Sequence, residues 1–210
     1  MHLRTRRSVR TAAWAGMVGP MLLGGTITTL TIVQRDFLRS LGWHPINAPT
    51  TDWPSGLALG PYGAAMTGTF IVSGGLLALF ALGLHQAIDR AEDRTGPVLL
   101  VVAGGATMLL AFRTDPSIGS TGRTVVGLIH DVAFGILGVS LLGALFTLAR
   151  RFRQDPYWRG HALYTVVTAL IVAPAFWFKG LMFYVFLMNI LLWFELTAWR
   201  LWCVGMVKNA

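Results

Sequence analysis

Six long apolar runs, separated by short polar segments, restrict what this chain can fold into. The runs cover residues 11–33, 62–88, 96–112, 124–148, 161–178 and 181–204. A transmembrane helix needs about 20 apolar residues to cross the hydrocarbon core of a bilayer, and each run comes near that length. Hydrophobic residues make up 54% of the sequence and charged residues only 12%, against about 25% charged in soluble domains. The sequence therefore predicts an all-α, polytopic helical bundle with six transmembrane helices in a cell membrane.

The first apolar run follows a basic head and has to be distinguished from a secretory signal peptide. Its apolar part, residues 11–33, is longer than the roughly 7–15 residues of a signal core, and no clear small-residue cleavage site follows it. We interpret it as the first membrane helix. By length, residues 1–210 are predicted to form a single integral membrane domain.

The distribution of basic residues predicts the orientation of the bundle. With the N-terminus in the cytoplasm, twelve Lys and Arg residues fall in inner segments and five in outer segments. The outer ones are Arg35, Arg39, Arg113, Arg123 and Lys179. The positive-inside rule therefore places both termini in the cytoplasm. It also explains the net charge of +8 without a nucleic-acid partner, because nucleic-acid binders gather basic residues on one face of a soluble fold.

With this orientation, the polar side chains of the membrane helices are predicted to concentrate in the outer half of the bundle. His130 and Asp131 lie six or seven residues below the outer end of the fourth helix, which is about 10 Å deep. An ionisable side chain at that depth costs about 2.5–3.5 kcal/mol and normally faces a partner or a wet cavity. Hydroxyl side chains predicted at similar depth are Thr26, Thr28, Thr29, Thr31, Thr67, Thr69, Ser73 and Thr107.

The fourth helix carries the charged residues of the predicted polar pocket. Arg123, His130 and Asp131, together with Gly127, are spaced so that they fall along one helical stripe. In this hypothesis Arg113 and Arg123 bind an anionic group, His130 transfers a proton, and Asp131 and Asp115 orient the two cations. Thr67 and Ser73 meet His130 at similar depth. The alternative is that His130 and Asp131 only form hydrogen bonds between helices and serve packing.

The segment FRTDPSIGSTGRTVVGLIHDVAF, which begins at Phe112, resembles the signature of a known family. This is the domain-of-unknown-function 998 family of bacterial and archaeal integral membrane proteins. In it, a loop like Phe-Pro-Thr-Asp-Pro precedes a helix that carries Gly and then Ile-His. Arg113 stands where that pattern has proline. The resemblance extends over nearly the whole chain and implies six spans and no known activity. The matching residues are Phe112, Thr114, Asp115, Pro116, Gly127, Ile129 and His130.

Metal and cofactor sites find little support in the residue pattern. His130, Asp131 and Asp115 are the nearest candidates for a metal, but adjacent helical residues point about 100° apart, so they cannot converge on one ion without ligands from other spans. A haem would need two histidines at matching depth, and His85 and His161 suit the inner membrane interface as well. No metal and no cofactor is predicted. Three glycine pairs are predicted to be close-packing surfaces, not phosphate loops: Gly24–Gly25, Gly74–Gly75 and Gly104–Gly105.

Three functions fit these residues. The first is a membrane protein whose outer-half polar pocket binds a lipid-like or small anionic ligand, with or without processing it; acyl transfer by Ser73 or Thr67 with His130 is one such reaction. The second is a non-enzymatic accessory subunit that packs against a partner in a larger membrane complex. The third is a small-solute transporter, for which matched inverted halves are missing from the sequence. Membrane lipids are expected partners in each case.

Overall fold

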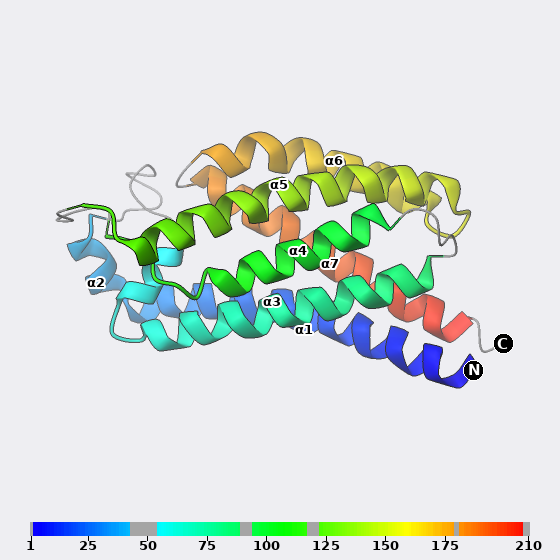
Figure 1. The fold of residues 1–210 in the computed structure, drawn as a ribbon, viewed down its shortest axis with the longest axis horizontal. Helices are drawn as coiled ribbons and strands as arrows, with labels where there is room; N and C mark the ends of the chain where they lie inside the picture. The colour runs from blue at the N-terminus through cyan, green and yellow to red at the C-terminus, as the bar shows by residue number, and fades with distance from the viewer. Residues whose placement is uncertain (1, 43–53, 89–93, 117–121, 179–180, 208–210) are drawn as a thin grey trace.

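The structure of the protein, a computed structural model, describes residues 2–42, 54–88, 94–116, 122–178 and 181–207. Within these ranges the chain is all helical and contains no strand. Six long helices run side by side in an elongated bundle (Figure 1). They are α1 (His2–Val33), α3 (Gly63–Ala87), α4 (Thr95–Leu109), α5 (Val125–Gln154), α6 (Arg159–Trp177) and α7 (Leu181–Val207). The prediction of an all-α bundle is confirmed.

Each predicted apolar run overlaps one of these helices, but the lengths of the helices differ from the prediction. Within the described residues, five helices, α1, α3, α5, α6 and α7, are long and apolar enough to cross a membrane. The helix α4 has 15 residues, because the chain turns at residues 110–112, where the predicted run still continued. At about 1.5 Å per residue α4 is roughly 22 Å long, which is shorter than a hydrocarbon core of about 30 Å.

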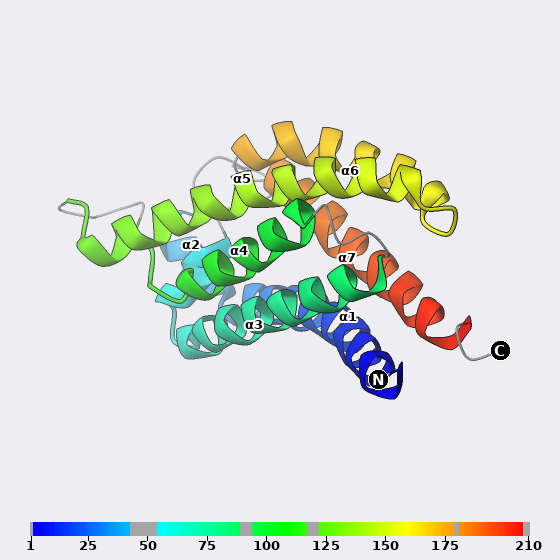
Figure 2. The ribbon, with the colours of Figure 1, turned by 45° about the vertical axis from the view of Figure 1, so that its right-hand side comes forward.

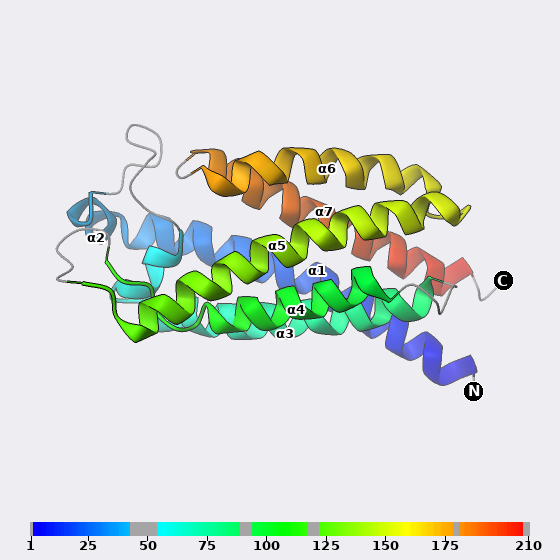
Figure 3. The ribbon, with the colours of Figure 1, turned by 45° about the horizontal axis from the view of Figure 1, so that its top comes forward.

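The six helices close a ring in chain order. Each packs against its neighbours in the sequence of long helices, and α7 returns to pack against α1. Figure 2 and Figure 3 show α4 lying between α3 and α5 in both rotated views. The start of α1 and the end of α7 lie at one end of the bundle, here called the terminal end (Figure 1). The α4–α5 connection lies at the opposite end, here called the loop end.

The outside of this ring is apolar along much of its length. Val139, Leu163 and Ile32 each expose about seven tenths of their surface. Many other aliphatic residues are exposed to a smaller extent. A soluble monomer rarely exposes apolar patches beyond a few hundred square ångströms, whereas lipid-facing helices expose apolar side chains as a rule. The exposed apolar surface and the five long apolar helices identify a multi-pass membrane protein.

Part of the segment between α1 and α3 is helical. A short helix α2 (Arg35–Ser40) follows α1, and a 3-10 helix η1 (Pro54–Leu59) precedes α3. Gln34, only 2% exposed, joins these parts. Its amide nitrogen donates to the carbonyl oxygen of Leu57 at 3.2 Å, and its amide oxygen accepts from the backbone nitrogen of Tyr62 at 3.2 Å. One buried side chain thus fastens η1 and the approach to α3 onto the end of α1.

Two of the glycine pairs bring α3 and α4 close together. A methyl group on Gly74 would lie 2.5 Å from the carbonyl oxygen of Gly104, and one on Gly104 would lie 2.7 Å from the carbonyl oxygen of Gly74. The second glycine of each pair, Gly75 or Gly105, has nothing within 4 Å of such a methyl group. Close packing, predicted for both pairs, is therefore the role of the first glycine in each.

Candidate functional site

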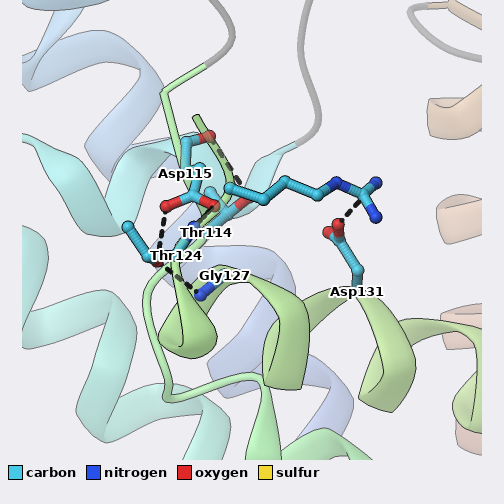
Figure 4. A network of polar contacts seen from close by, with 6 residues as sticks. Thr114, Asp115, Thr124, Gly127 and Asp131 are labelled. Atoms are coloured by element: carbon cyan, nitrogen blue, oxygen red, sulfur yellow. Dashed lines mark hydrogen bonds and ion pairs between the residues drawn. The ribbon is translucent and has the colours of Figure 1, made fainter. Parts of the chain in front are cut away.

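At the loop end, hydrogen bonds among Asp115, Thr124 and Gly127 hold the N-terminus of α5, and we call this group the polar clasp (Figure 4). Thr124 caps the helix, because its hydroxyl oxygen accepts a hydrogen bond from the backbone nitrogen of Gly127 at 3.0 Å. The carboxylate of Asp115 accepts from the Thr124 hydroxyl at 2.7 Å and from the Thr124 backbone nitrogen at 2.9 Å. The hydrogen bond from the Thr124 hydroxyl has the larger effect, and both bonds lower the pKa of Asp115 below its ordinary value. This carboxylate therefore stays ionised at neutral pH.

Gly127 leaves room for this clasp. It is buried on α5, and a methyl group at this position would collide with the carboxylate of Asp115. A residue without a side chain at this position lets another group approach the helix closely. The group that approaches is Asp115, from the loop that precedes the same helix. Asp115 and Gly127 of the signature segment therefore form one local structure.

His130 connects α5 to the end of α4 through hydrogen bonds. Its ring is 4% exposed, and Nδ1 lies 2.7 Å from the carbonyl oxygen of Phe112 and 3.1 Å from that of Leu110. Carbonyl oxygens only accept hydrogen bonds, so we assign the ring proton to Nδ1, which leaves a lone pair on Nε2. Within the described part of the chain, no donor contacts Nε2. The rings of His130 and Phe70 meet edge to face, with 6.5 Å between the ring centroids.

The structure separates Asp131 and Arg123 from His130 and so splits the predicted stripe in two. Gly127 and His130 face the interior, whereas the Asp131 and Arg123 side chains are 44% and 74% exposed. These two form an ion pair of 3.1 Å on the outside of α5 (Figure 4). The physical reason is the 100° turn between consecutive helical residues, which directs Asp131 away from the face that buries His130. An exposed pair of this kind contributes at most about 1 kcal/mol.

The remaining predicted site residues also lie apart from one another. Arg113 is exposed and forms no ion pair within the described ranges. Ser73 is buried, and its hydroxyl donates to the carbonyl oxygen of Gly19 on α1 at 3.2 Å. The Thr67 hydroxyl is buried and has no hydrogen-bond partner among the described residues. Of the seven predicted site residues, Ser73 and His130 line one cavity, and the other five are absent from its lining.

A cavity of about 110 Å³ lies inside the ring and reaches from η1 along α1, α3, α5 and α7. Its lining on α3 runs from Met66 to Phe80, fourteen helical steps or about 21 Å of helix. Aliphatic and aromatic side chains make up most of the wall. The polar pocket predicted from the sequence is therefore replaced by a largely apolar cavity. The polar side chains in its lining are Ser55, Ser73, Thr107 and His130.

A second set of buried polar side chains lies towards the terminal end, where the sequence analysis did not expect it. His161 Nε2 lies 2.8 Å from the hydroxyl of Thr197, and Trp193 Nε1 donates to the hydroxyl of Thr165 at 3.0 Å. All four side chains are at most 5% exposed. Buried polar side chains therefore lie towards both ends of the bundle and are not concentrated at the loop end. The spacing was visible in the sequence, because each pair of residues on one helix, 161 with 165 and 193 with 197, is four apart and shares a face.

Among the comparisons with known proteins, the chain matches a family model. Residues 27–200 match the model of a family described as "Protein of unknown function (DUF998)". No curated protein and no solved structure matches the chain significantly. In the part of the chain that the structure describes, no group of three or more His, Cys, Asp or Glu side chains lies close enough together to hold a metal ion.

Proposed function

Since the chain belongs to the DUF998 family, whose description assigns no function, we propose one from its geometry: it is a membrane protein that binds a single-chain, lipid-like molecule within its helical ring. The cavity that begins at η1 and runs along α1, α3, α5 and α7 carries this proposal. The ligand's apolar chain lies between the helices, and its polar end lies near His130.

The size of the cavity favours one apolar chain. A site needs about 10–15 Å³ for each water-sized group, so about 110 Å³ accommodates on the order of ten such groups. Its length of about 21 Å along α3 exceeds half of a hydrocarbon core of about 30 Å. A chain that normally occupies one leaflet therefore fits lengthwise, whereas two chains side by side do not.

The charges around the cavity favour an uncharged ligand over an anionic one. Arg113 and Arg123 are exposed and absent from the cavity lining, and Arg123 is already paired with Asp131. An ionised group inside an apolar cavity needs a partner charge, because desolvation otherwise costs several kcal/mol. Binding is also better supported than processing, since Ser73, the nearest candidate nucleophile in the lining, directs its hydroxyl proton to the carbonyl of Gly19.

We propose that the ring spans the membrane six times, with α4 as the short third span and the terminal end in the cytoplasm. The exposed basic residues Arg7, Arg10, Arg150, Arg153 and Arg159 lie towards the terminal end. At the loop end, Arg35 and Arg39 lie within 4 Å of Asp36, and Arg123 pairs with Asp131. The positive-inside rule then sets the orientation. Of the basic residues whose distribution predicts the orientation, Arg90, Lys179 and Lys208 lie outside the described residues.

This orientation predicts the behaviour of reporter fusions. A green fluorescent protein fused after Ala210 should fluoresce, and alkaline phosphatase fused at the same position should be inactive, because it folds only outside the cytoplasm. Phosphatase inserted between α4 and α5 should be active. The opposite pattern at both positions would reject the proposed orientation.

A tryptophan inside the cavity tests the proposed function. Leu77 belongs to the lining on α3, between Ser73 and Phe80, so Leu77→Trp should fill the space and weaken binding of tritiated hexadecanol at least about tenfold in phosphatidylcholine nanodiscs. Leu79, two residues further on, is 39% exposed on the outside of the helix. Leu79→Trp is the matched control and should bind as the wild type does. No saturable binding by the wild type, or equal binding by both variants, would refute the proposal.

A further inference from the structure

We propose that the ligand carries a hydroxyl group and that Nε2 of His130 accepts its hydrogen bond. This inference rests on the proposed function, a single-chain ligand in the cavity, and adds the chemistry of the polar end. The ligand class is an uncharged, single-chain lipid with a hydrogen-bond donor at one end, such as a long-chain alcohol.

The hydrogen bonds of His130 determine which ring nitrogen is available. Nδ1 donates to the carbonyl oxygens of Leu110 and Phe112, at the point where α4 ends and leaves carbonyls without helical partners. The ring is therefore held in one tautomer and one orientation by the backbone of the turn that follows α4. Nε2 keeps its lone pair, and no donor among the described residues contacts it. The ring is 4% exposed and lies in the wall of the cavity.

The other polar side chains on the α-helices that line the cavity also present acceptors. The hydroxyl of Ser73 donates its proton to the carbonyl of Gly19 at 3.2 Å, and the hydroxyl of Thr107 donates to the carbonyl of Ala103 at 2.8 Å. Their free electron pairs, like Nε2 of His130, can only accept further hydrogen bonds. A buried acceptor without a donor is unfavourable, so this part of the wall selects a ligand that brings a donor.

The same chemistry discriminates between polar ends of similar size. A hydroxyl group donates one hydrogen bond, whereas a methyl ether or an ionised carboxylate only accepts and leaves Nε2 without a partner. Because His130 lies near the loop end of the cavity, the hydroxyl lies there as well. The apolar chain then extends towards Phe80 and Phe194, which line its other end.

The experiment compares hexadecanol with hexadecyl methyl ether in wild type and in His130→Asn. Asparagine keeps a nitrogen donor close to the position of Nδ1, so the ties to Leu110 and Phe112 are retained, but it has no group at the position of Nε2. We expect the wild type to bind the alcohol about five- to tenfold more tightly than the ether, which corresponds to one buried hydrogen bond. His130→Asn should bind the two compounds equally. Leu128→Ala, on the exposed side of the same helix turn, is the control and should keep the preference.

Each outcome separates this inference from the proposed function. Saturable binding of both compounds with equal affinity by the wild type would overturn the hydroxyl inference and leave the lipid cavity standing. Saturable binding of neither would overturn both, and a preference that persists in His130→Asn would exclude His130 as the acceptor. Should that variant fail to fold, the ¹⁵N resonance of His130 Nε2 in the wild type decides. It should move on addition of the alcohol and stay in place on addition of the ether; equal shifts would overturn the inference.

Discussion

Gly74→Ala should lower the free energy of unfolding by about 3 kcal/mol, the upper end of the range for overpacking a buried contact. The added methyl group would lie 2.5 Å from the carbonyl oxygen of Gly104 and 2.8 Å from the backbone nitrogen of Met108. Both obstructing atoms belong to the backbone of α4, so no side-chain rotation can relieve the overlap. The two helices must move apart, and α4 must also shift against α5. Unfolding by sodium dodecyl sulfate, followed by circular dichroism, measures the change.

The neighbouring glycine provides the control for Gly74→Ala. Gly75→Ala places a methyl group with nothing within 4 Å, on the outward side of the same helix turn. Alanine favours a helix over glycine by up to about 1 kcal/mol in water, so this variant should be as stable as the wild type or slightly more stable. Gly104→Ala and Gly105→Ala should repeat the contrast on α4. Equal losses at Gly74 and Gly75 would mean that the α3–α4 contact does not cause the loss at Gly74.

Trp193→Ala should also have a large effect and lower the free energy of unfolding by about 4 kcal/mol. Trp193 is fully buried between α6 and α7, and its ring meets that of Phe194 edge to face at 5.0 Å. Truncation removes the largest side chain of this contact and leaves a cavity that the surrounding helices can only partly close. It also leaves the hydroxyl of Thr165 without the indole donor at 3.0 Å.

Two further substitutions separate packing from hydrogen bonding at Trp193. Trp193→Phe keeps most of the ring and removes the indole donor, so it should cost about 1 kcal/mol. Trp199→Ala is the control on the same helix, because that side chain is 59% exposed on the outside of the ring. Its loss should change stability by less than about 1 kcal/mol. A loss at Trp199 equal to that at Trp193 would contradict the account of a buried anchor. The same unfolding assay serves for all three variants.

The hydrogen bonds around Trp193 explain why this region is sensitive. Thr165 donates its own proton to the carbonyl of His161 at 2.9 Å while it accepts from Trp193. Thr197 donates to the carbonyl of Trp193 at 2.6 Å and contacts His161 Nε2 at 2.8 Å. Each hydroxyl therefore joins α6 to α7 and satisfies a polar group that lies away from water. Loss of one of these hydrogen bonds leaves a buried polar atom unsatisfied and disturbs the neighbouring bonds. The stability losses caused by substitutions at these residues should therefore not be additive.

Most of the secondary structure was readable from the sequence. The predicted runs 62–88, 124–148 and 161–178 contain most of α3, α5 and α6, because a bilayer sets the length of an apolar segment and apolar segments in lipid form helices. The family resemblance was readable as well, and the match over residues 27–200 confirms it. The third run was predicted too long, because residues 110–112 are apolar or aromatic and yet turn to deliver carbonyl oxygens to His130.

The candidate site was predicted less well, and His130 illustrates the reason. Its burial and its importance to the signature segment followed from depth and motif, but the sequence could not distinguish a ligand from a backbone carbonyl as its partner. Asp115 was assigned to orienting cations, whereas it accepts two hydrogen bonds from Thr124 and lies against Gly127. Gln34 was missed altogether, since an isolated glutamine at a helix end carries no pattern.

Spacing along one helix, together with the length of each apolar run, determined that this chain forms a membrane helical bundle and where most of its helices begin and end. The tertiary structure alone decided which face of each helix lies inside. It turned His130 inward and Asp131 outward, selected Gly74 over Gly75, and left a cavity between α1, α3, α4, α5 and α7. The physical reason is that helix formation depends on local hydrogen bonds and on lipid thickness. A cavity depends on side chains far apart in sequence, whose positions are set only when the ring closes.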